Sequence, residues 1–447
     1  MTPCWNSSVG TMNCAADSDD SLSSRCTQLT QKCGTNREPA HVDDGSVMDL
    51  PPDVELFLST ARTRVDSDTA TRIRATAMQG IDWAHLTAAA HSHGTIPLLY
   101  SCLNASCPES LPSGVLDRLR GAFDANARHS RLLTEELIRL AKLFGSHGIR
   151  AIPFKGPVLA ASAYGDYALR QFVDLDILIH KRDVLRARDL LISDGYRPRR
   201  QRNDAQEAAY LRVGHEYEFV HNDGGVGVDL HWRITPRRLF SQFPFERLWD
   251  QAIPVSLNGT MVLSLAPEDL IMILSVHGAK HMWQRLQWIC DIAEVVRAHP
   301  QIDWARLMGR AGELGCQRMV CLGLLLASDL LDAPVPTGIA QRLYASSEVA
   351  SLATKVSKGL FGPPCARLGA LERFRFHLAA RERAGDRVRC LVFFLHSAIT
   401  PTYGDWELLP LPSRLFFLYY FLRPFRVLGK YGRRGLKQIL NHPVHDG

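Results

Sequence analysis

The sequence predicts an α+β protein in which a small α/β core with a mixed sheet is flanked by N-terminal and C-terminal helical modules. Apolar residues recur at helical spacing from 54 to 148 and again from 267 onward. Between these regions, residues 149 to about 250 alternate short extended runs with helical segments. A chain of 447 residues that is 46% hydrophobic also has enough apolar material for two or three domains.

The first 50 residues are rich in Ser, Thr, Asp, Asn and Cys and show no apolar periodicity. This composition predicts a disordered N-terminal extension over 1–50. Met48 directly precedes Asp49-Leu50-Pro51-Pro52 and the first helical pattern, so we expect it to be the true start. An intact mass that includes residues 1–47, measured on protein from the native gene context, would contradict this expectation.

Helical modules are predicted on both sides of the core, over 51–148 and 256–447. The N-terminal pattern includes Leu133, Leu137 and Leu140, which share one helical face. In the C-terminal module, Pro267-Glu268-Asp269 begins a helix with proline and acidic residues in its first turn. We detect no internal repeat.

The core, 149–255, begins with the apolar run 149–154, which ends in Lys155-Gly156-Pro157 before a helical segment, 158–164. This order predicts a strand, a tight turn and a helix start. Glycine followed by proline lets backbone amides approach a phosphate, and Lys155 adds a positive charge. Arg170 is a second candidate for phosphate binding.

Two carboxylates lie two residues apart in the strand-like run from Gln171 to Ile179. Residues i and i+2 of a strand share a face, so Asp174 and Asp176 are predicted to lie side by side. Two like charges in this arrangement are usually held by a cation, and oxygen ligands suit magnesium, with manganese as an alternative. A nucleoside triphosphate would complete such a site. The alternative is that both carboxylates end the strand and face water.

A third carboxylate, Asp229, lies in the second of two extended segments, 215–220 and 227–232, which the turn signal Asn222-Asp223-Gly224-Gly225 joins. A sheet that sets Asp229 beside Asp174 and Asp176 would make a three-carboxylate metal site. Such a site can hold two metal ions for an in-line nucleotidyl displacement, in which one ion lowers the pKa of the attacking hydroxyl.

The helix after Pro267 carries His277 and His281 four residues apart, which is the spacing of paired metal ligands. Structural hydrogen bonds are the preferred interpretation over zinc, because no glutamate follows His277. Lys280 or His281 would reach a nucleotide from this helix, with Asp291 orienting a partner. Base stacking and core packing are both open for three tryptophans: Trp232, Trp283 and Trp288.

Several separate segments of the chain occur in the same order as in uncharacterised bacterial nucleotidyltransferases of the polymerase-beta-like superfamily, and the chain resembles that family. The resemblance covers roughly residues 54 to 430. It is carried by Phe154-Lys155-Gly156, Tyr164-Gly165-Asp166, Arg170, Asp174-Leu175-Asp176-Ile177-Leu178-Ile179, Gly195-Tyr196, Val228-Asp229-Leu230-His231-Trp232 and the helical signature from Val276 to Ile292.

The resemblance implies that Asp174 and Asp176 are metal ligands and that Asp229 is the catalytic base or a second-metal ligand. It also implies that Lys155, Gly156 and Arg170 face the triphosphate. Better-studied branches of the superfamily carry Gly-Ser on the first turn, whereas this chain has Lys155-Gly156.

The remaining composition agrees with a cytoplasmic enzyme. The net charge of +6 permits an anionic partner, and basic clusters such as Arg197 to Arg202 are expected to be solvated faces. Eleven cysteines lack both an even count and zinc-finger spacing, which favours reduced thiols. The N-terminus lacks a secretory signal pattern, and no phosphate loop of the Gly-x-x-x-x-Gly-Lys-Ser type occurs.

An apolar run with basic residues after it, 415–434, is too short to cross a membrane, because a spanning helix needs roughly 20 apolar residues. It would either contact an anionic membrane surface or a protein partner, or pack as a core helix.

The sequence thus predicts a metal-dependent nucleotidyltransferase that moves a nucleoside monophosphate from a triphosphate such as ATP to an acceptor and releases pyrophosphate. The acceptor class stays open among a small molecule, a glycan, a peptide and RNA. One alternative is a toxin-like transferase that modifies tRNA or protein. Another is a catalytically silent binding module that keeps the fold, against which the three intact carboxylates argue.

Overall fold

The computed structural model describes residues 50–202, 204–234, 245–362, 369–399, 418–426 and 429. The predicted N-terminal extension, apart from Leu50, and the proposed start at Met48 lie outside these residues. The chain forms a mixed sheet with helices around it, which confirms the predicted α+β class.

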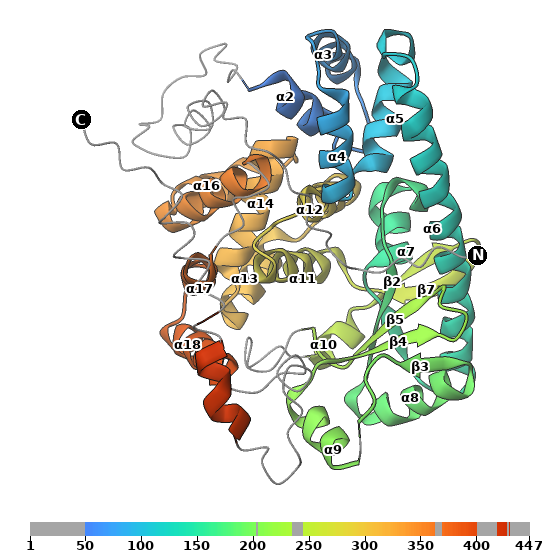
Figure 1. Cartoon of the computed structure of the whole chain (residues 1–447), viewed down its shortest axis with the longest axis vertical. Helices are drawn as coiled ribbons and strands as arrows, with labels where there is room; N and C mark the ends of the chain where they lie inside the picture. The colour runs from blue at the N-terminus through green and yellow to red at the C-terminus, as the bar shows by residue number, and fades with distance from the viewer. Residues whose placement is uncertain are drawn as a thin grey trace.

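The N-terminal region is helical, as its apolar periodicity predicts. Asp66 and Asp82 each cap a helix by accepting a hydrogen bond from the backbone N–H three residues on. The last helix of this region is 32 residues long and runs beside the sheet (Figure 1). The helices are α2 (Pro52–Ser59), α3 (Ser67–Ala77), α4 (Trp83–His93), α5 (Ile96–Ser106), η1 (Pro108–Ser110) and α6 (Val115–Ser146).

The central region alternates strands and helices, as the sequence predicts. The elements are β1 (Ala151–Pro153), α7 (Gly156–Leu159), the π-helix η2 (Ala160–Tyr164), η3 (Tyr167–Leu169), β2 (Asp174–Ile179), η4 (Lys181–Asp183), α8 (Val184–Ser193), β3 (Tyr196–Pro198), α9 (Asp204–Val213), β4 (Glu216–His221), β5 (Gly227–His231) and α10 (Phe245–Asp250). Strands β1, β2, β4 and β5 lie in the predicted extended runs. A tight loop joins β4 and β5, where Asp223 accepts a hydrogen bond from the Gly225 N–H.

A second hairpin follows, formed by β6 (Ile253–Leu257) and β7 (Thr260–Ser264). The sequence interpretation did not anticipate it, and the proposed domain boundary between 255 and 256 falls inside β6. β7 packs against β1, so the hairpin extends the strand-rich part of the molecule. The division into modules therefore stays a prediction. The boundary between the core and the C-terminal module fits better just before Pro267, where the helices begin.

The C-terminal region is helical from Pro267 onward. Its helices are α11 (Pro267–Lys280), α12 (Leu286–Ala298), α13 (Trp304–Leu314), α14 (Gln317–Leu331), α15 (Thr337–Tyr344), α16 (Ser347–Phe361), α17 (Ala370–Ala379) and α18 (Ala384–Ile399). Residues 419–426 are also helical, and Tyr420, Phe421 and Phe425 are exposed there, while most other residues of 415–434 lie outside the described part. Contact of this segment with a membrane or protein stays a prediction. Among the described helices, none combines the length and apolarity needed to cross a bilayer.

The five-stranded sheet has the order β1-β2-β5-β4-β3, and β2 and β5 are its parallel pair. One face of the sheet is apolar and packs on α6 and α8 through residues such as Leu137, Leu191 and Leu175. Alternate residues of β2, β4 and β5 point to the opposite face, and they are mostly acidic. The strand periodicity thus separates a packed face from a polar face that can carry chemistry.

The N-terminal and C-terminal helices share one hydrophobic core. Leu56 and Leu98 from the N-terminal side belong to the same buried cluster as Leu270 and Leu324 from the C-terminal side. Ile152, Phe154 and Leu178 of the sheet region join it. The two helical regions therefore form a common support against which one side of the sheet is fixed.

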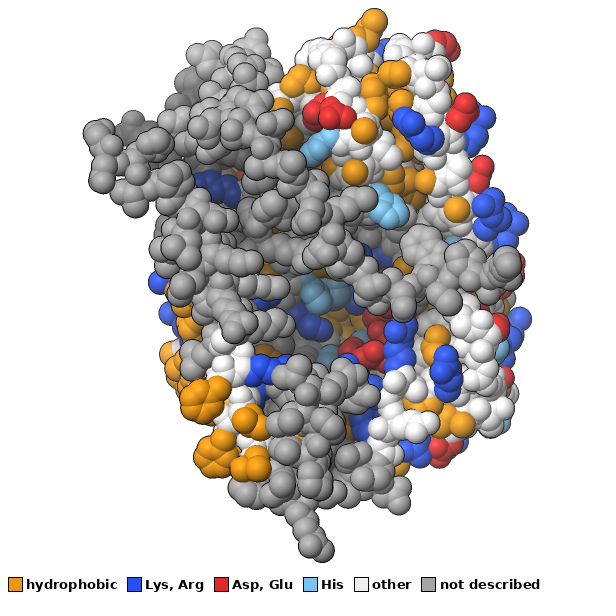
Figure 2. All heavy atoms as spheres, in the orientation of Figure 1, with side chains coloured by type: hydrophobic (Ala, Val, Ile, Leu, Met, Phe, Trp, Pro, Cys, Tyr) orange, Lys and Arg blue, Asp and Glu red, His pale blue; other side chains and the backbone are white. Residues whose placement is uncertain are grey.

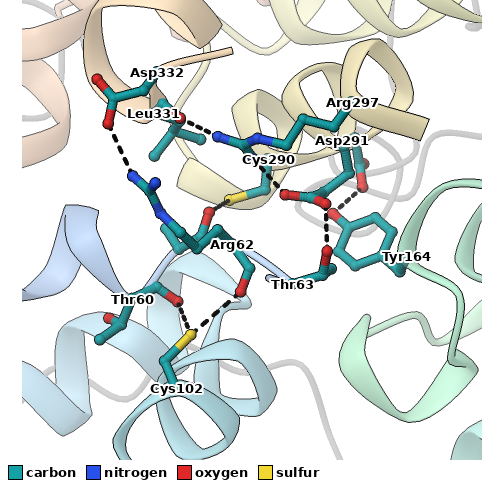
Figure 3. A network of polar contacts seen from close by, with 12 residues as sticks. Thr60, Arg62, Thr63, Cys102, Tyr164, Cys290, Asp291, Arg297, Leu331 and Asp332 are labelled. Atoms are coloured by element: carbon teal, nitrogen blue, oxygen red, sulfur yellow. Dashed lines mark hydrogen bonds and ion pairs between the residues drawn. The ribbon is translucent and has the colours of Figure 1, made fainter. Parts of the chain in front are cut away.

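A polar network on α12 strengthens this support (Figure 3). The Cys290 thiol donates to the Ala61 carbonyl, and the Thr63 hydroxyl donates to Glu294 at 2.6 Å. On the side facing the sheet, Asp291 accepts a hydrogen bond from the Tyr164 hydroxyl at 2.7 Å. Helix α12 therefore connects the N-terminal helices to the segment that leads into β2.

Trp283 is fully buried between two glycines, and we predict a large loss of stability when either glycine gains a side chain. A Cβ atom at Gly278 would lie 2.5 Å from the Trp283 ring, and one at Gly323 would lie 3.0 Å from it. Gly278→Ala is expected to lower the free energy of unfolding by about 1–3 kcal/mol, measured by urea denaturation. Gly338→Ala, where a Cβ meets no atom within 4 Å, is the control. Equal stability of both variants would contradict this packing.

Candidate functional site

Three carboxylates meet on the polar face of the sheet. The parallel register pairs Asp176 of β2 with Asp229 of β5, and it pairs Asp174 with Gly227. Paired residues of adjacent strands point to the same face, so the structure brings Asp174, Asp176 and Asp229 together. In Figure 2, acidic, basic and histidine side chains gather in a recess near the centre of the molecule.

Two of these carboxylates have no protein partner. In the part of the chain that the structure describes, neither a hydrogen bond nor an ion pair engages the side chains of Asp174 and Asp229. Burial, followed by the charge of Asp176, raises the pKa of Asp174 to about 6. Burial, followed by the charge of Asp174, raises the pKa of Asp229 to about 7. Close, half-buried like charges of this kind are stabilised when a cation joins them.

Asp176 is held by two side chains. Its Oδ1 lies 3.3 Å from the Lys155 Nζ and 3.0 Å from the His231 Nε2. Burial opposes ionisation of Asp176, but Lys155 and His231 outweigh it and lower the pKa of this carboxyl. Burial likewise opposes the charge of His231, but the hydrogen bond with Asp176 raises the pKa of the imidazole. Asp176 is therefore ionised and fixed in orientation.

His231 is a site residue that the sequence interpretation named only as part of a segment. Together with Asp176 and Asp229 it makes a group whose ligand atoms all lie within 4.8 Å of one another. Its Nδ1 lies 3.4 Å from Glu216 of β4. The signal was available, because Asp229-Leu230-His231 repeats the polar-apolar-polar alternation of Asp174-Leu175-Asp176 and so places His231 on the same face.

The turn Lys155-Gly156 lies against the start of β2. Gly156 has a φ of 55°, a conformation that residues with a Cβ rarely adopt, and a Cβ here would lie 3.4 Å from the Asp174 carbonyl. The turn places Lys155 next to Asp176. The positive φ, rather than a lack of space, is therefore the reason for glycine at this position.

Helix α11 covers one side of the recess. The His277 Nδ1 lies 3.4 Å from the Lys155 Nζ, and burial lowers the pKa of His277. Burial also lowers the pKa of Lys280, although Glu216 opposes the shift. Burial lowers the pKa of His281 to about 4, and its ring lies 5.2 Å from that of Trp288. The helix thus presents Lys280 and neutral histidines near the carboxylates.

Zinc at His277 and His281 gains no support, because the group of potential metal ligands found among the described residues contains neither histidine. The hypothesis that Trp232 and Trp283 stack on a base is wrong. Trp283 is 0% exposed and Trp232 is 2% exposed, so both are core residues. Trp288 is only partly buried and stays beside the histidines.

Arg170 lies in a buried ion pair. Its guanidinium forms two hydrogen bonds with Asp291, at 2.7 and 2.8 Å, and both residues are buried. Tyr164 donates to the same carboxylate. A guanidinium paired in this way has a structural role in positioning the segment before β2, and the phosphate contact that the resemblance implies for Arg170 stays a prediction.

The residues present fit a hard divalent cation. Three carboxylates provide the oxygen ligands that magnesium prefers, and the two with no protein partner have free lone pairs. His231 fixes the third carboxylate in the manner of residues that orient metal ligands. The ligand atoms of Asp176, Asp229 and His231 lie close enough together to hold one ion, and Asp174 lies on the same face as a further candidate ligand.

Comparison with known proteins agrees with this chemistry. A family model described as uncharacterised nucleotidyltransferase matches residues 79–332, which is more than half of the chain and includes every residue of the recess. No curated protein matches the chain. The match covers most of the chain and agrees with the acidic face of the sheet. The chain therefore belongs to the uncharacterised nucleotidyltransferase family.

Proposed function

We propose that this protein is a magnesium-dependent nucleotidyltransferase of the polymerase-beta-like type, which transfers a nucleoside monophosphate from a triphosphate to an acceptor hydroxyl. The observation that carries the proposal is the pair of partly buried, unpaired carboxylates, Asp174 and Asp229, on adjacent strands. Such a pair costs stability in the absence of a cation, so its presence indicates a functional site. The match to the nucleotidyltransferase family supports the same reaction class.

Each side chain has a role that its position supports. Bound metal ions would lower the pKa of the acceptor hydroxyl and neutralise charge on the departing pyrophosphate. Lys155, and Lys280 from α11, lie beside the carboxylates and provide positive charge for the triphosphate. Asp229, on the strand next to Asp176, would accept the proton of the hydroxyl or bind a second metal ion. His231 and Lys155 hold Asp176 in place.

The nucleotide would lie against α11. His281 and Trp288 form a partly buried aromatic surface next to Lys280, suited to contact with a base or ribose. No observation favours one base over another, so ATP is only one of four candidate donors. The cytoplasm, where nucleoside triphosphates and magnesium are abundant, is the compartment that suits this activity.

The proposal predicts that a nucleoside triphosphate binds only in the presence of magnesium. Calorimetry with each of the four ribonucleoside triphosphates would compare the native chain with Asp174→Asn/Asp176→Asn. We expect this double variant to lose at least about tenfold in affinity, because metal-bridged phosphate contacts disappear. Asp117→Asn/Asp124→Asn removes the same charge from the exposed surface of α6 and is the control.

Magnesium-independent binding, or equal affinity of the two double variants, would refute the proposed metal site. Absence of binding by the folded native chain would favour the silent binding module. Transfer to tRNA or protein would identify the toxin-like alternative, for which no contact in the recess argues at present.

A further inference from the structure

The basic segment Arg197 to Arg202 lies at the edge of the sheet, next to the acidic face. The Arg199 N–H donates to the Glu218 carbonyl at 2.9 Å, immediately after β3. Glu218 is paired with Asp229, and Asp229 is paired with Asp176. Arg199 therefore ends a row of residues that crosses the sheet and contains two of the three carboxylates.

The side chain of Arg199 extends back over the sheet. A Cβ built on Gly227 would lie 3.9 Å from the Arg199 Nη2 and 3.6 Å from the Cβ of Asp174. The guanidinium thus lies over Gly227 of β5, which belongs to the neighbouring row with Asp174 and Val220 and has no side chain. The bare glycine leaves the space in which an arginine can approach the carboxylates.

Arg199 has unused hydrogen-bonding capacity. It is exposed, and among the residues that the structure describes no hydrogen bond or ion pair engages its guanidinium. The end of the same segment is fixed, because the Arg202 guanidinium lies 3.7 Å from the ring centroid of Tyr210. A fixed segment that directs an unpaired guanidinium towards the carboxylates is better suited to contact a ligand than to form a solvated surface.

The reaction geometry decides which substrate this guanidinium faces. Lys155 follows β1 and Arg199 follows β3, and these strands are the opposite edges of the sheet, with the carboxylates between them. In an in-line displacement the attacking oxygen and the leaving pyrophosphate lie on opposite sides of the α-phosphorus. If the triphosphate lies at Lys155, the attacking hydroxyl enters from the side of Arg199.

We propose that Arg199 binds an anionic group, a phosphate or a carboxylate, on the acceptor. The proposal rests on the proposed function and adds the chemical class of the second substrate. The new bond joins the acceptor oxygen to the α-phosphorus, the bond to the β-phosphate oxygen breaks, and the hydroxyl proton passes to Asp229. Arg199 takes no part in these bond changes. Its planar fork would hold the anion through two parallel hydrogen bonds.

The test uses the full chain saturated with magnesium and a non-hydrolysable α,β-methylene analogue of whichever triphosphate binds. Inorganic phosphate is then titrated into this complex by calorimetry, so that only the acceptor side is free. We expect phosphate to bind the native chain and Arg199→Ala to weaken this binding about 10- to 100-fold, the loss typical of a charged hydrogen bond. Arg199→Lys should recover part of the affinity. A parallel titration with acetate would distinguish a carboxylate site from a phosphate site.

Arg200→Ala is the matched control, because it removes the same charge from the next exposed residue. The inference is overturned if neither anion binds the native complex, or if Arg200→Ala weakens anion binding as much as Arg199→Ala does. It is also overturned if Arg199→Ala weakens binding of the triphosphate analogue, which would place Arg199 on the donor side. Failure of every triphosphate to bind the native chain refutes the proposed function, and this result is visible before any anion is added.

Discussion

The Asp229→Asn variant is expected to lose nucleotidyl transfer and yet to be more stable than the native chain at pH 8. Loss of a general base typically costs about a hundredfold to ten-thousandfold in rate. The gain in stability has an electrostatic cause, because Asp229 is partly buried beside Asp174, and among the described residues no side chain forms a hydrogen bond or an ion pair with it. Opposite signs for activity and stability are typical of residues that are kept for function.

The pH dependence gives this prediction its sign. The pKa of Asp229 is about 7 in the folded protein and 3.8 in the unperturbed state. The folded state therefore binds the proton more tightly, and the stability that the protonated carboxyl contributes is lost as pH rises from about 4 through about 7. Each pKa unit corresponds to roughly 1.4 kcal/mol, so the effect at pH 8 is on the order of a few kcal/mol.

Urea denaturation without divalent metal at pH 8 and pH 4 measures this effect. We expect Asp229→Asn to exceed the native free energy of unfolding at pH 8 and to approach it at pH 4. Magnesium should stabilise the native chain at pH 8 and have a smaller effect on the variant, which keeps Asp174 and Asp176. Asp124→Asn, on the exposed surface of α6, provides the control. A variant less stable than the native chain at pH 8 would show that Asp229 makes a stabilising contact.

The second large effect is expected from Asp291→Asn, which leaves the Arg170 guanidinium buried without a counter-charge. Breaking a buried ion pair from one side typically costs about 3–5 kcal/mol. Asp291 is 1% exposed and also accepts from the Tyr164 hydroxyl, so the substitution disturbs two buried partners. Because these contacts fix the segment that leads into β2, triphosphate binding should weaken as well.

Urea denaturation at pH 7 would compare Asp291→Asn with Asp332→Asn, whose ion pair with Arg62 involves a carboxylate that is 64% exposed. Arg62 is only 9% exposed, but its partner Asp332 is open to solvent, so Asp332→Asn is expected to cost less than Asp291→Asn. Asp291→Leu/Arg170→Met should regain much of the stability, since removing both charges leaves neither one unpaired. If Asp291→Asn costs no more than Asp332→Asn, Arg170 finds another partner and the structural role assigned to it is wrong.

Alternation and turn chemistry made much of the fold predictable. The runs that contain Asp174 and Asp229 alternate polar and apolar residues, which fixes both as strands with one acidic face. The β4–β5 hairpin follows from its Asn-Asp-Gly-Gly turn, and α8 ends at Ser193, followed by Asp194 and a glycine with positive φ. The β6–β7 hairpin was missed, but it was also predictable, because Asn258-Gly259, a typical hairpin turn with positive φ at both residues, lies between two short extended segments.

Roles that depend on distant partners were not predictable. Arg170 and Asp291 lie 121 positions apart, so nothing local distinguishes an arginine that binds phosphate from one in a buried ion pair. The same holds for Trp283, whose burial depends on the absence of side chains at Gly278 and Gly323. His231 could have been found by extending the strand alternation by one residue pair.

The sequence by itself determined strands β1, β2, β4 and β5, the acidic face and the chemistry of its carboxylates, because strand periodicity and side-chain type are local properties of the chain. Tertiary structure alone decided that β2 and β5 are neighbours in a parallel register that pairs Asp176 with Asp229. It also decided which charges are paired. Asp176 is held by Lys155 and His231, and Arg170 by Asp291, while among the described residues the side chains of Asp174, Asp229 and Arg199 form no hydrogen bond or ion pair. Pairing depends on distances across the folded molecule, and burial then sets how strongly each charge acts.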